Sequence, residues 1–194
     1  MVVGLTGKYC AGKNTAARVL EKRGFFVIDE DLIGHEVLES ESQRVTEGFG
    51  PDILDTNGRI SRQKLGAVVF NNREKLKLLE SILHPVMVYQ TKELLAKRKQ
   101  QHAAINAAVL FKMELHKICD FVITIKAPFV LRLHRALKRD KRGLIRSLER
   151  IWSQRSLNKG AWNVDMYSVC NVWRQSALAS GIGVILEKRG LRDL

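Results

Sequence analysis

The sequence predicts an α/β protein in which helices cover a parallel sheet. Residues 2–31 read as a strand, a turn containing glycines, a helix and a second strand, which is how a parallel α/β sheet begins. Residues 32–100 have a mostly helical pattern, and β-branched runs return at residues 104–110 and 121–125. The sheet is therefore expected to be interrupted by a helical insertion.

The N-terminal elements have clear boundaries. Residues 2–6 are apolar and largely β-branched, as in a buried strand. Residues 14–23 have helical periodicity and stop before Gly24, a residue that commonly follows the end of a helix. The apolar run at residues 25–28 predicts a second strand, which leads directly into the acidic residues 29–31.

The insertion has turns at residues 49–51 and 57–58, and apolar residues at three- and four-residue spacing near residues 76–83. His84-Pro85 is expected to interrupt this helix, because the residue before proline is disfavoured in the helical region. A basic helix is then predicted from about residue 86 to 101.

The C-terminal half returns to the sheet. Residues 121–125 form the clearest strand in the chain, and a basic helix is expected over about residues 130–153. A fifth strand is predicted near residues 167–172. The remaining C-terminal residues have no clear pattern.

Composition limits the class of protein. The chain has 194 residues, of which 45% are hydrophobic, enough for a buried core rather than extended disorder. It lacks both an apolar run of about 20 residues and the layout of a signal peptide. The cysteines at 10, 119 and 170 form no metal motif, so a cytoplasmic chain with free thiols is expected. The net charge of +13 points to an anionic partner: nucleic acid, a phosphorylated metabolite or a membrane surface.

Residues 7–14 match the phosphate-binding pattern G-x-x-x-x-G-K and are followed by a helix. The glycines allow the backbone N–H groups to surround an anion, the helix adds its positive end, and the lysine reaches the β- and γ-phosphates. The alternative is a glycine-rich turn with an incidental lysine. The residues concerned are Gly7, Lys8, Tyr9, Cys10, Ala11, Gly12, Lys13 and Asn14.

Asn14 stands where this pattern has a hydroxyl that ligates Mg²⁺. Its amide oxygen is also a suitable ligand, and we prefer it to Thr15, whose side chain points about 100° further round the helix. Cys10 has two interpretations: a thiol activated by the loop N–H groups, or a small residue that fills space, which we prefer.

Asp29 and Asp31 follow the second strand, at the sheet edge where ligands of open α/β sheets bind. Phosphoryl transfer to a hydroxyl needs a carboxylate that orients the hydroxyl and accepts its proton. Two acids separated by one residue point the same way in an extended segment. The alternative is an acidic N-cap for a helix beginning near Leu32.

A stripe of arginines is predicted on the basic helix, within an arc of about 80°. Guanidinium groups bind phosphates and stabilise the charge of a transferring phosphoryl group. A solvated basic face, or contact with nucleic acid or a membrane, would give the same pattern. The stripe consists of Arg132, Arg135, Arg139, Arg142, Arg146 and Arg150.

Several of these segments, in this order, resemble dephospho-CoA kinases over about residues 1–155. The resemblance begins with residues 5–15 and 27–31 and ends with Arg135, Arg139-Asp140 and the segment from Arg150 to Gln154. Between them lie the similar segments 49–54, 57–60, Arg62, 69–70, 79–80 and 84–85.

The resemblance implies ATP- and Mg²⁺-dependent phosphorylation of the ribose 3′-hydroxyl of dephospho-CoA, the last step of coenzyme A synthesis. It implies Asp31 as general base, Lys13 and Arg139 on the transferring phosphoryl group, and Asp29, Arg62 and His84 on the substrate side. ATP would bind residues 7–15 and Arg139, with Asn14 on the metal.

The resemblance also implies a P-loop kinase core with a parallel five-stranded sheet flanked by helices, a helical substrate-binding insertion and a helical lid. The core would comprise residues 1–31, 103–128 and 160–194, the CoA-binding insertion residues 32–102, and the lid residues 129–159. We expect a monomer, with a homo-oligomer as the alternative, and a function that needs neither nucleic acid nor membrane.

The chain departs from the family pattern at three places. Asn14 replaces the loop hydroxyl, Ala108 and Lys112 stand where the family has a proline and an acid, and residues 165–171 only faintly match its adenine-contacting segment. Two alternatives therefore stay open: a P-loop kinase for another small nucleotide or sugar alcohol, or a basic relative that has lost catalysis and binds nucleic acid.

Overall fold

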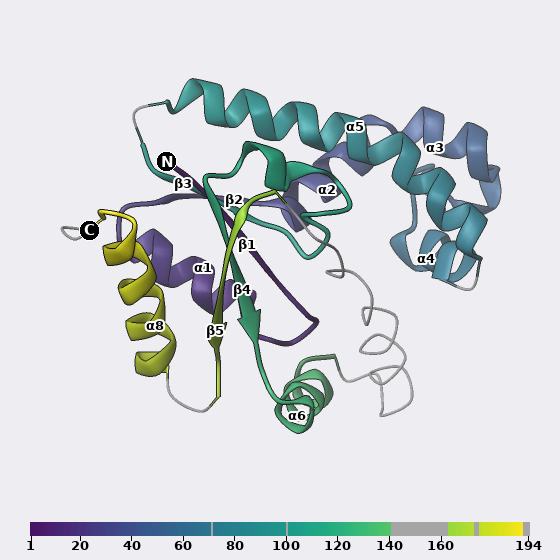
Figure 1. Cartoon of the computed structure of the whole chain (residues 1–194). Coiled ribbons are helices and arrows are strands. Elements are labelled where there is room, and N and C mark those ends of the chain that lie inside the picture. The colour runs from purple at the N-terminus through teal and green to yellow at the C-terminus, as the bar shows by residue number, and fades with distance from the viewer. Residues whose placement is uncertain (71, 100, 141–162, 173–174, 192–194) are drawn as a thin grey trace. The chain divides into compact units, whose positions relative to one another are not determined.

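The computed structural model describes residues 1–70, 72–99, 101–140, 163–172 and 175–191 (Figure 1). The chain divides into two compact units. One contains residues 1–28 and 98–194, and the other contains residues 29–97. Each is described by itself.

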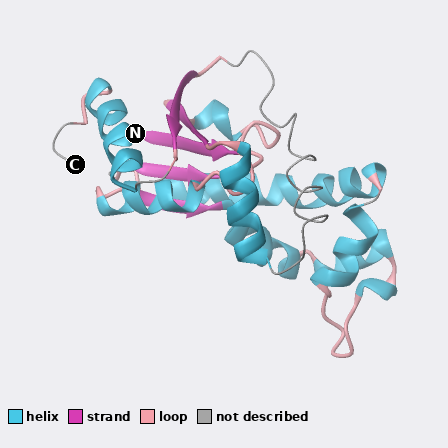
Figure 2. Cartoon of the chain, turned by 90° about the horizontal axis from the view of Figure 1, so that it is seen from below, coloured by secondary structure: helices cyan, strands magenta, loops and turns pink. Residues whose placement is uncertain are grey.

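A five-stranded sheet forms the first unit, with the strand order β2-β3-β1-β4-β5 (Figure 2). β1 lies at its centre and pairs in parallel with β3 and β4, and β5 pairs in parallel with β4. The predicted parallel five-stranded sheet flanked by helices is confirmed. The strands are β1 (Val2–Gly7), β2 (Phe26–Asp29), β3 (Ala103–Asn106), β4 (Phe121–Lys126) and β5 (Asp165–Cys170).

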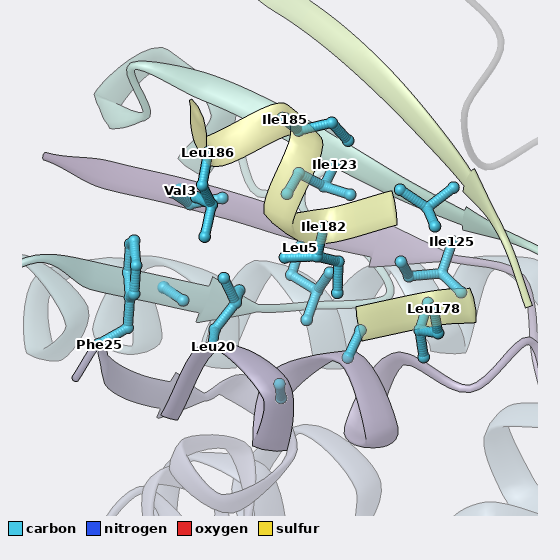
Figure 3. Packing of buried hydrophobic residues seen from close by; sticks show 14 of the residues in the cluster. Val3, Leu5, Leu20, Phe25, Ile123, Ile125, Leu178, Ile182, Ile185 and Leu186 are labelled. Carbon is cyan, nitrogen blue, oxygen red and sulfur yellow. The ribbon is translucent and has the colours of Figure 1, made fainter. Parts of the chain in front are cut away.

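Two helices, α1 (Lys13–Lys22) and α8 (Gln175–Lys188), pack on each other and against strands of this sheet. Figure 3 shows their apolar side chains meeting those of the central strands. Leu20 and Ile182 are fully buried there, together with Leu5 and Ile123 of the strands. Burial of this apolar surface supplies the main driving force for folding of the unit.

The helix predicted over residues 14–23 is confirmed, and Gly24 follows it with a φ of +81°. α8 occupies the C-terminal segment for which the sequence predicted no element. The basic helix expected over residues 130–153 is present as α6 (Phe129–Asp140), whereas residues 141–153 lie outside the described part of the chain.

The second unit is helical, as predicted for the insertion. Apolar residues from its helices form a separate core that includes Val45, Ile53, Leu65 and Ile82. The predicted stripe near residues 76–83 faces this core. The elements are α2 (Glu30–Ser40), α3 (Ser42–Phe49), the 3₁₀ turn η1 (Pro51–Ile53), α4 (Arg62–Phe70) and α5 (Arg73–Lys97).

The prediction that His84-Pro85 interrupts the helix is wrong, because α5 continues through Pro85. Proline has no N–H to donate to the carbonyl four residues earlier, which costs helix stability. Ile82 precedes it and Met87 and Thr91 follow it, and all three are buried. Packing on both sides of the proline therefore holds the helix together.

The strand predicted over residues 104–110 is also shorter than expected, since β3 ends at Asn106. The next residues form turns that lead to a 3₁₀ helix, η2 (Leu115–Ile118). Leu110 and Phe111 are buried, and a Cβ atom on Gly4 would lie 2.8 Å from Leu110 Cδ2. The apolar character of Leu110 thus reflects packing against β1 and not membership of the strand.

The packing of α8 predicts that two nearby residues of this helix contribute differently to stability. Ile182 is fully buried and Val184 is 50% exposed. We expect Ile182→Ala to lower the free energy of unfolding by about 2–5 kcal/mol, because it leaves a cavity. The matched change Val184→Ala is expected to alter it by less than about 0.5 kcal/mol. Urea denaturation of both variants checks this; equal losses would contradict the described packing.

Candidate active site: the phosphate loop

The glycine-rich loop connects β1 to α1, so the sheet places it at the C-terminal end of the central strand. Gly7 is the last residue of β1 and lies against β4. A Cβ atom at this position would be 2.5 Å from the backbone oxygen of Ile125, too close for any side chain. The loop therefore begins at a backbone contact that only glycine permits.

Gly12 has a φ of +100° and is the N-cap of α1. A Cβ atom here would lie 2.0 Å from the Nδ2 atom of Asn171. Both the left-handed conformation and the approach of Asn171 require glycine. Two independent features of the structure thus require glycine at this second position of the motif.

The carbonyl groups of the loop are held by side chains distant in sequence. Asn171 Nδ2 donates to Ala11 O at 2.9 Å, and Arg132 Nε donates to Tyr9 O at 2.9 Å. Arg135 Nη1 also donates to Ala11 O, at 3.4 Å, and its Nη2 donates to Val172 O at 3.0 Å. These bonds occupy loop carbonyls, so the loop conformation is stabilised by α6 and by the residues that follow β5.

Arg132 and Arg135 belong to the predicted arginine stripe but have a role that the sequence did not predict, because they donate to carbonyl groups of the loop. Arg132 is only 6% exposed, and burial lowers the pKa of its guanidinium group. Both arginines bind loop carbonyls, and Arg135 is half-buried. The side chain of Arg139, and the whole of Arg142, Arg146 and Arg150, lie outside the described part of the chain.

The N-terminal end of α1 directly follows the loop. No side chain caps this helix terminus, so its first N–H groups are not occupied by a capping oxygen. Lys13 is the first helical residue, and its Nζ atom donates to Gly7 O at 3.3 Å. The side chains of Asn14 and Lys8 are exposed at the same end of the sheet.

Asn14 Oδ1 accepts a hydrogen bond of 3.3 Å from Asn106 Nδ2 at the end of β3. This bond orients the oxygen of the predicted metal ligand, whereas Thr15 is half-buried. Among the described residues there is no cluster of three or more His, Cys, Asp or Glu side chains that could hold a metal by itself.

Cys10 has a φ of +58° and is half-buried. It packs with Leu133 against the small cluster formed by Tyr9 and Ala136. These contacts favour the interpretation of Cys10 as a residue that fills space between the loop and α6.

Asp29 and Asp31 do not share an extended segment, so that part of the prediction is wrong. Asp29 ends β2, and α2 begins immediately at Glu30. Asp29 Oδ1 accepts a hydrogen bond of 2.9 Å from the N–H of Asp31, so the alternative of an N-cap is confirmed for Asp29. The side chain of Asp31 is exposed in the first turn of α2.

The remaining predicted substrate residues lie in the helical unit. Arg62 begins α4 and its Nη2 atom is 3.9 Å from Glu39 Oε1, with both side chains exposed. His84 is half-buried in α5.

Lys112, which stands where the family pattern has an acid, is exposed in the segment that follows β3.

Sequence reasoning missed the roles of Asn171, Asn106 and Arg132. Asn171 and Asn106 each stand at the carboxyl end of a strand beside β1 or β4, which is the available signal. Asn171 is 6% exposed and Asn106 is 4% exposed, unusual burial for amides. Arg132 gave no signal that separated it from the other arginines.

Comparison with known proteins agrees with this geometry. The family model described as dephospho-CoA kinase matches residues 1–167. The chain belongs to the dephospho-CoA kinase family. The resemblance stated from the sequence is thereby confirmed.

Among relatives, the dephospho-CoA kinase of Treponema denticola is 30% identical over 207 residues, covering 98% of this chain and 91% of that protein. The dephospho-CoA kinase of Borreliella burgdorferi is 39% identical over 128 residues, which is 66% of this chain and 62% of the relative's length. The matched part thus spans less than two thirds of that relative.

The solved structures share the fold. The crystal structure of TT1252 from Thermus thermophilus has a TM-score of 0.82 at 22% identity and covers 97% of both chains. The dephospho-CoA kinase from Campylobacter jejuni has a TM-score of 0.61 at 23% identity, covering 96% of both chains.

Over the described part of the chain, every helix is too short or too polar to cross a membrane.

The left-handed backbone of Gly12 and the close approach of Asn171 predict that Gly12→Ala weakens nucleotide binding by at least about 100-fold, or roughly 2.7 kcal/mol. The methyl group would displace Asn171 and strain the loop. Gly24→Ala is a matched control, since its φ of +81° also strains alanine but no atom lies within 4 Å of the added Cβ. It should lower stability by about 1–2 kcal/mol without changing the affinity for a fluorescent ATP analogue. Equal affinities for both variants would contradict this account.

Proposed function

We propose that this chain transfers the γ-phosphoryl group of ATP to the ribose 3′-hydroxyl of dephospho-CoA, giving coenzyme A and ADP. The observation that carries the proposal is the phosphate loop, with an uncapped helix terminus on one side and occupied carbonyls on the other, in a member of the dephospho-CoA kinase family. Such a loop binds the phosphates of a nucleotide.

Residues 7–15 bind the ATP phosphates in this proposal. Lys13 moves its ammonium group from the Gly7 carbonyl to the β- and γ-phosphates when the nucleotide enters, since a phosphate oxygen is a stronger acceptor than a neutral carbonyl. Its positive charge then stabilises the charge that develops on the transferring group.

Mg²⁺, when bound, neutralises charge on the β- and γ-phosphate oxygens. Asn14 fits this ion, because Asn106 donates to its side-chain oxygen and thereby identifies Oδ1 as an oriented acceptor. Mg²⁺ typically keeps several water ligands and needs only one or two protein oxygens beside the phosphates.

Asp31 is the proposed general base. Its carboxylate is exposed in the first turn of α2, while Asp29 caps the helix and anchors the Asp31 backbone. The carboxylate orients the ribose hydroxyl and accepts its proton as the phosphoryl group is transferred. Asp29 belongs to the substrate side of the same segment.

Arg62, His84 and Arg139 complete the proposal. Arg62 makes only a long, exposed ion pair with Glu39, which contributes little and is readily exchanged for a substrate phosphate. His84 contributes to the substrate side from α5. Arg139 stabilises the transferring phosphoryl group from the predicted lid over residues 129–159. The core of residues 1–31, 103–128 and 160–194 and the CoA-binding insertion of residues 32–102 stay predictions.

Release of ADP from ATP and Mg²⁺ tests the reaction. We expect turnover only in the presence of dephospho-CoA. Lys13→Ala should abolish it, and Asp31→Asn should lower kcat by about 10²–10⁴-fold because the general base is lost. Lys22→Ala, an exposed lysine at the end of α1, is the control and should retain full activity. A folded chain that binds ATP but does not turn over dephospho-CoA would contradict the proposal.

The metal ligand has a separate test. We expect Asn14→Ala to raise the Mg²⁺ concentration for half-maximal activity by about tenfold, the loss of about 1.4 kcal/mol. Asn14→Ser supplies another oxygen ligand and should restore most of the Mg²⁺ affinity. Thr15→Val should leave the Mg²⁺ dependence unchanged. A rise with Thr15→Val but not with Asn14→Ala would instead assign Thr15 as the ligand.

A further inference from the structure

Glu30 is a buried carboxyl group that the proposed reaction does not use. It lies between Asp29 and Asp31 and is only 2% exposed, whereas Asp31 is exposed. Burying a carboxylate is costly unless it is paired or hydrogen-bonded. The contacts of Glu30 therefore indicate what this residue does beside the proposed base.

The contacts of Glu30 restrict where the hydrogen atoms of Glu30 and Thr91 can lie. Glu30 Oε1 is 2.6 Å from Thr91 Oγ1 on α5, and Thr91 Oγ1 is 2.8 Å from the carbonyl oxygen of Met87. A hydroxyl carries one hydrogen, and the carbonyl of Met87 can only accept. If Thr91 donates to Met87, the short contact with Glu30 needs a hydrogen from the carboxyl group.

The second carboxyl oxygen supports the same assignment. Glu30 Oε2 is buried and has no hydrogen-bond partner among the described residues. An ionised carboxylate would leave negative charge on this atom without any donor, whereas a neutral carboxyl group leaves only a weakly polar carbonyl oxygen. In this arrangement the Glu30 carboxyl group donates to Thr91 Oγ1, and the Thr91 hydroxyl donates to the Met87 carbonyl. Each donor then has an acceptor.

The charges around Glu30 also favour the neutral form. The pKa of Glu30 is raised to about 7, mainly by burial and also by the negative charges of Asp29 and Asp31, and the Thr91 bond partly offsets this rise. From α5 the facing groups are Thr91 and Met87, which are uncharged. No cation of α3 or α5 acts on Glu30 within the described residues.

We propose that protonated Glu30 is a positioning residue that ties the first turn of α2 to α5 and thereby holds Asp31 in place for phosphoryl transfer. The role rests on the proposed function. The neutral side chain also avoids a third negative charge beside Asp29 and Asp31, where it would repel a polyphosphate. Loss of its proton leaves a buried negative charge at the start of α2, where Thr91 contacts Oε1 and Oε2 has no hydrogen-bond partner among the described residues.

The proton also links stability to pH. In the unfolded chain Glu30 has its ordinary pKa of 4.5, and in the folded chain the value is about 7. The folded state therefore holds more protons between these values, so this contribution is complete below pH 4.5 and disappears as the pH rises through 7. The Tm of the unmodified chain should fall over this range relative to a variant that stays neutral.

Glu30→Gln is the central variant, because its amide is neutral at every pH and can donate to Thr91 Oγ1. The matched control is Glu36→Gln, an exposed glutamate on the same helix. For all three proteins, kcat, the KM for each substrate and Tm are measured from pH 6 to 9. The kcat of the unmodified chain and of Glu36→Gln should fall above about pH 7. The kcat of Glu30→Gln, divided by the kcat of the unmodified chain, should therefore rise at least tenfold by pH 8.5. KM for ATP should stay unchanged.

A second variant, Thr91→Val, removes the partner of Glu30 and should lower both Tm and kcat. Infrared spectra at pH 6 should show a protonated carboxyl band in the unmodified chain that is absent in Glu30→Gln. A kcat ratio that is constant with pH would overturn the positioning role, and identical Tm profiles would overturn the assignment of the proton. If no protein turns over dephospho-CoA, the proposed function and the positioning role both fail, while the Tm and infrared comparisons still decide the protonation of Glu30.

Discussion

The site depends on hydrogen bonds to the carbonyl groups of the phosphate loop. A loop that turns its N–H groups toward an anion leaves carbonyl groups on the opposite side, and buried carbonyls need donors. Arg132 and Asn171 supply donors to Tyr9 and Ala11. Without them, the conformation that prepares the loop for a phosphate would leave buried acceptors unsatisfied.

Sheet topology explains how these donors reach the loop. β4 lies beside β1, and β5 lies beside β4, so the segments that follow these strands emerge next to the loop that follows β1. α6 and Asn171 therefore meet residues that precede them by more than 120 positions. The same closeness requires glycine at positions 7 and 12, because a Cβ atom would overlap the Ile125 carbonyl or the Asn171 amide.

The helical unit shows a related division of roles among three consecutive acids. Asp29 caps α2, Glu30 is buried against α5, and Asp31 remains exposed. In the sequence they are equivalent acidic residues, but the start of a helix directs them to different surroundings. A helix that begins at Glu30 therefore separates a capping carboxylate, a buried carboxyl group and an exposed carboxylate.

Local patterns were sufficient to predict much of this protein. The parallel sheet, the loop between β1 and α1 and the helical unit follow from periodicity and motif spacing, because burial on one face imposes a repeat on neighbouring residues. The family followed from the resemblance of several segments, in order, to dephospho-CoA kinases. Pro85 and residues 107–110 were predicted incorrectly, because packing of α5 outweighs the cost of proline and because Leu110 is apolar for its contact with β1. The inward orientation of Arg132, the bond of Asn171 to the loop and the burial of Glu30 depend on contacts between residues far apart in the chain. Such contacts leave no periodic signal in a single sequence, so folding alone distinguishes these residues from the other arginines, asparagines and glutamates.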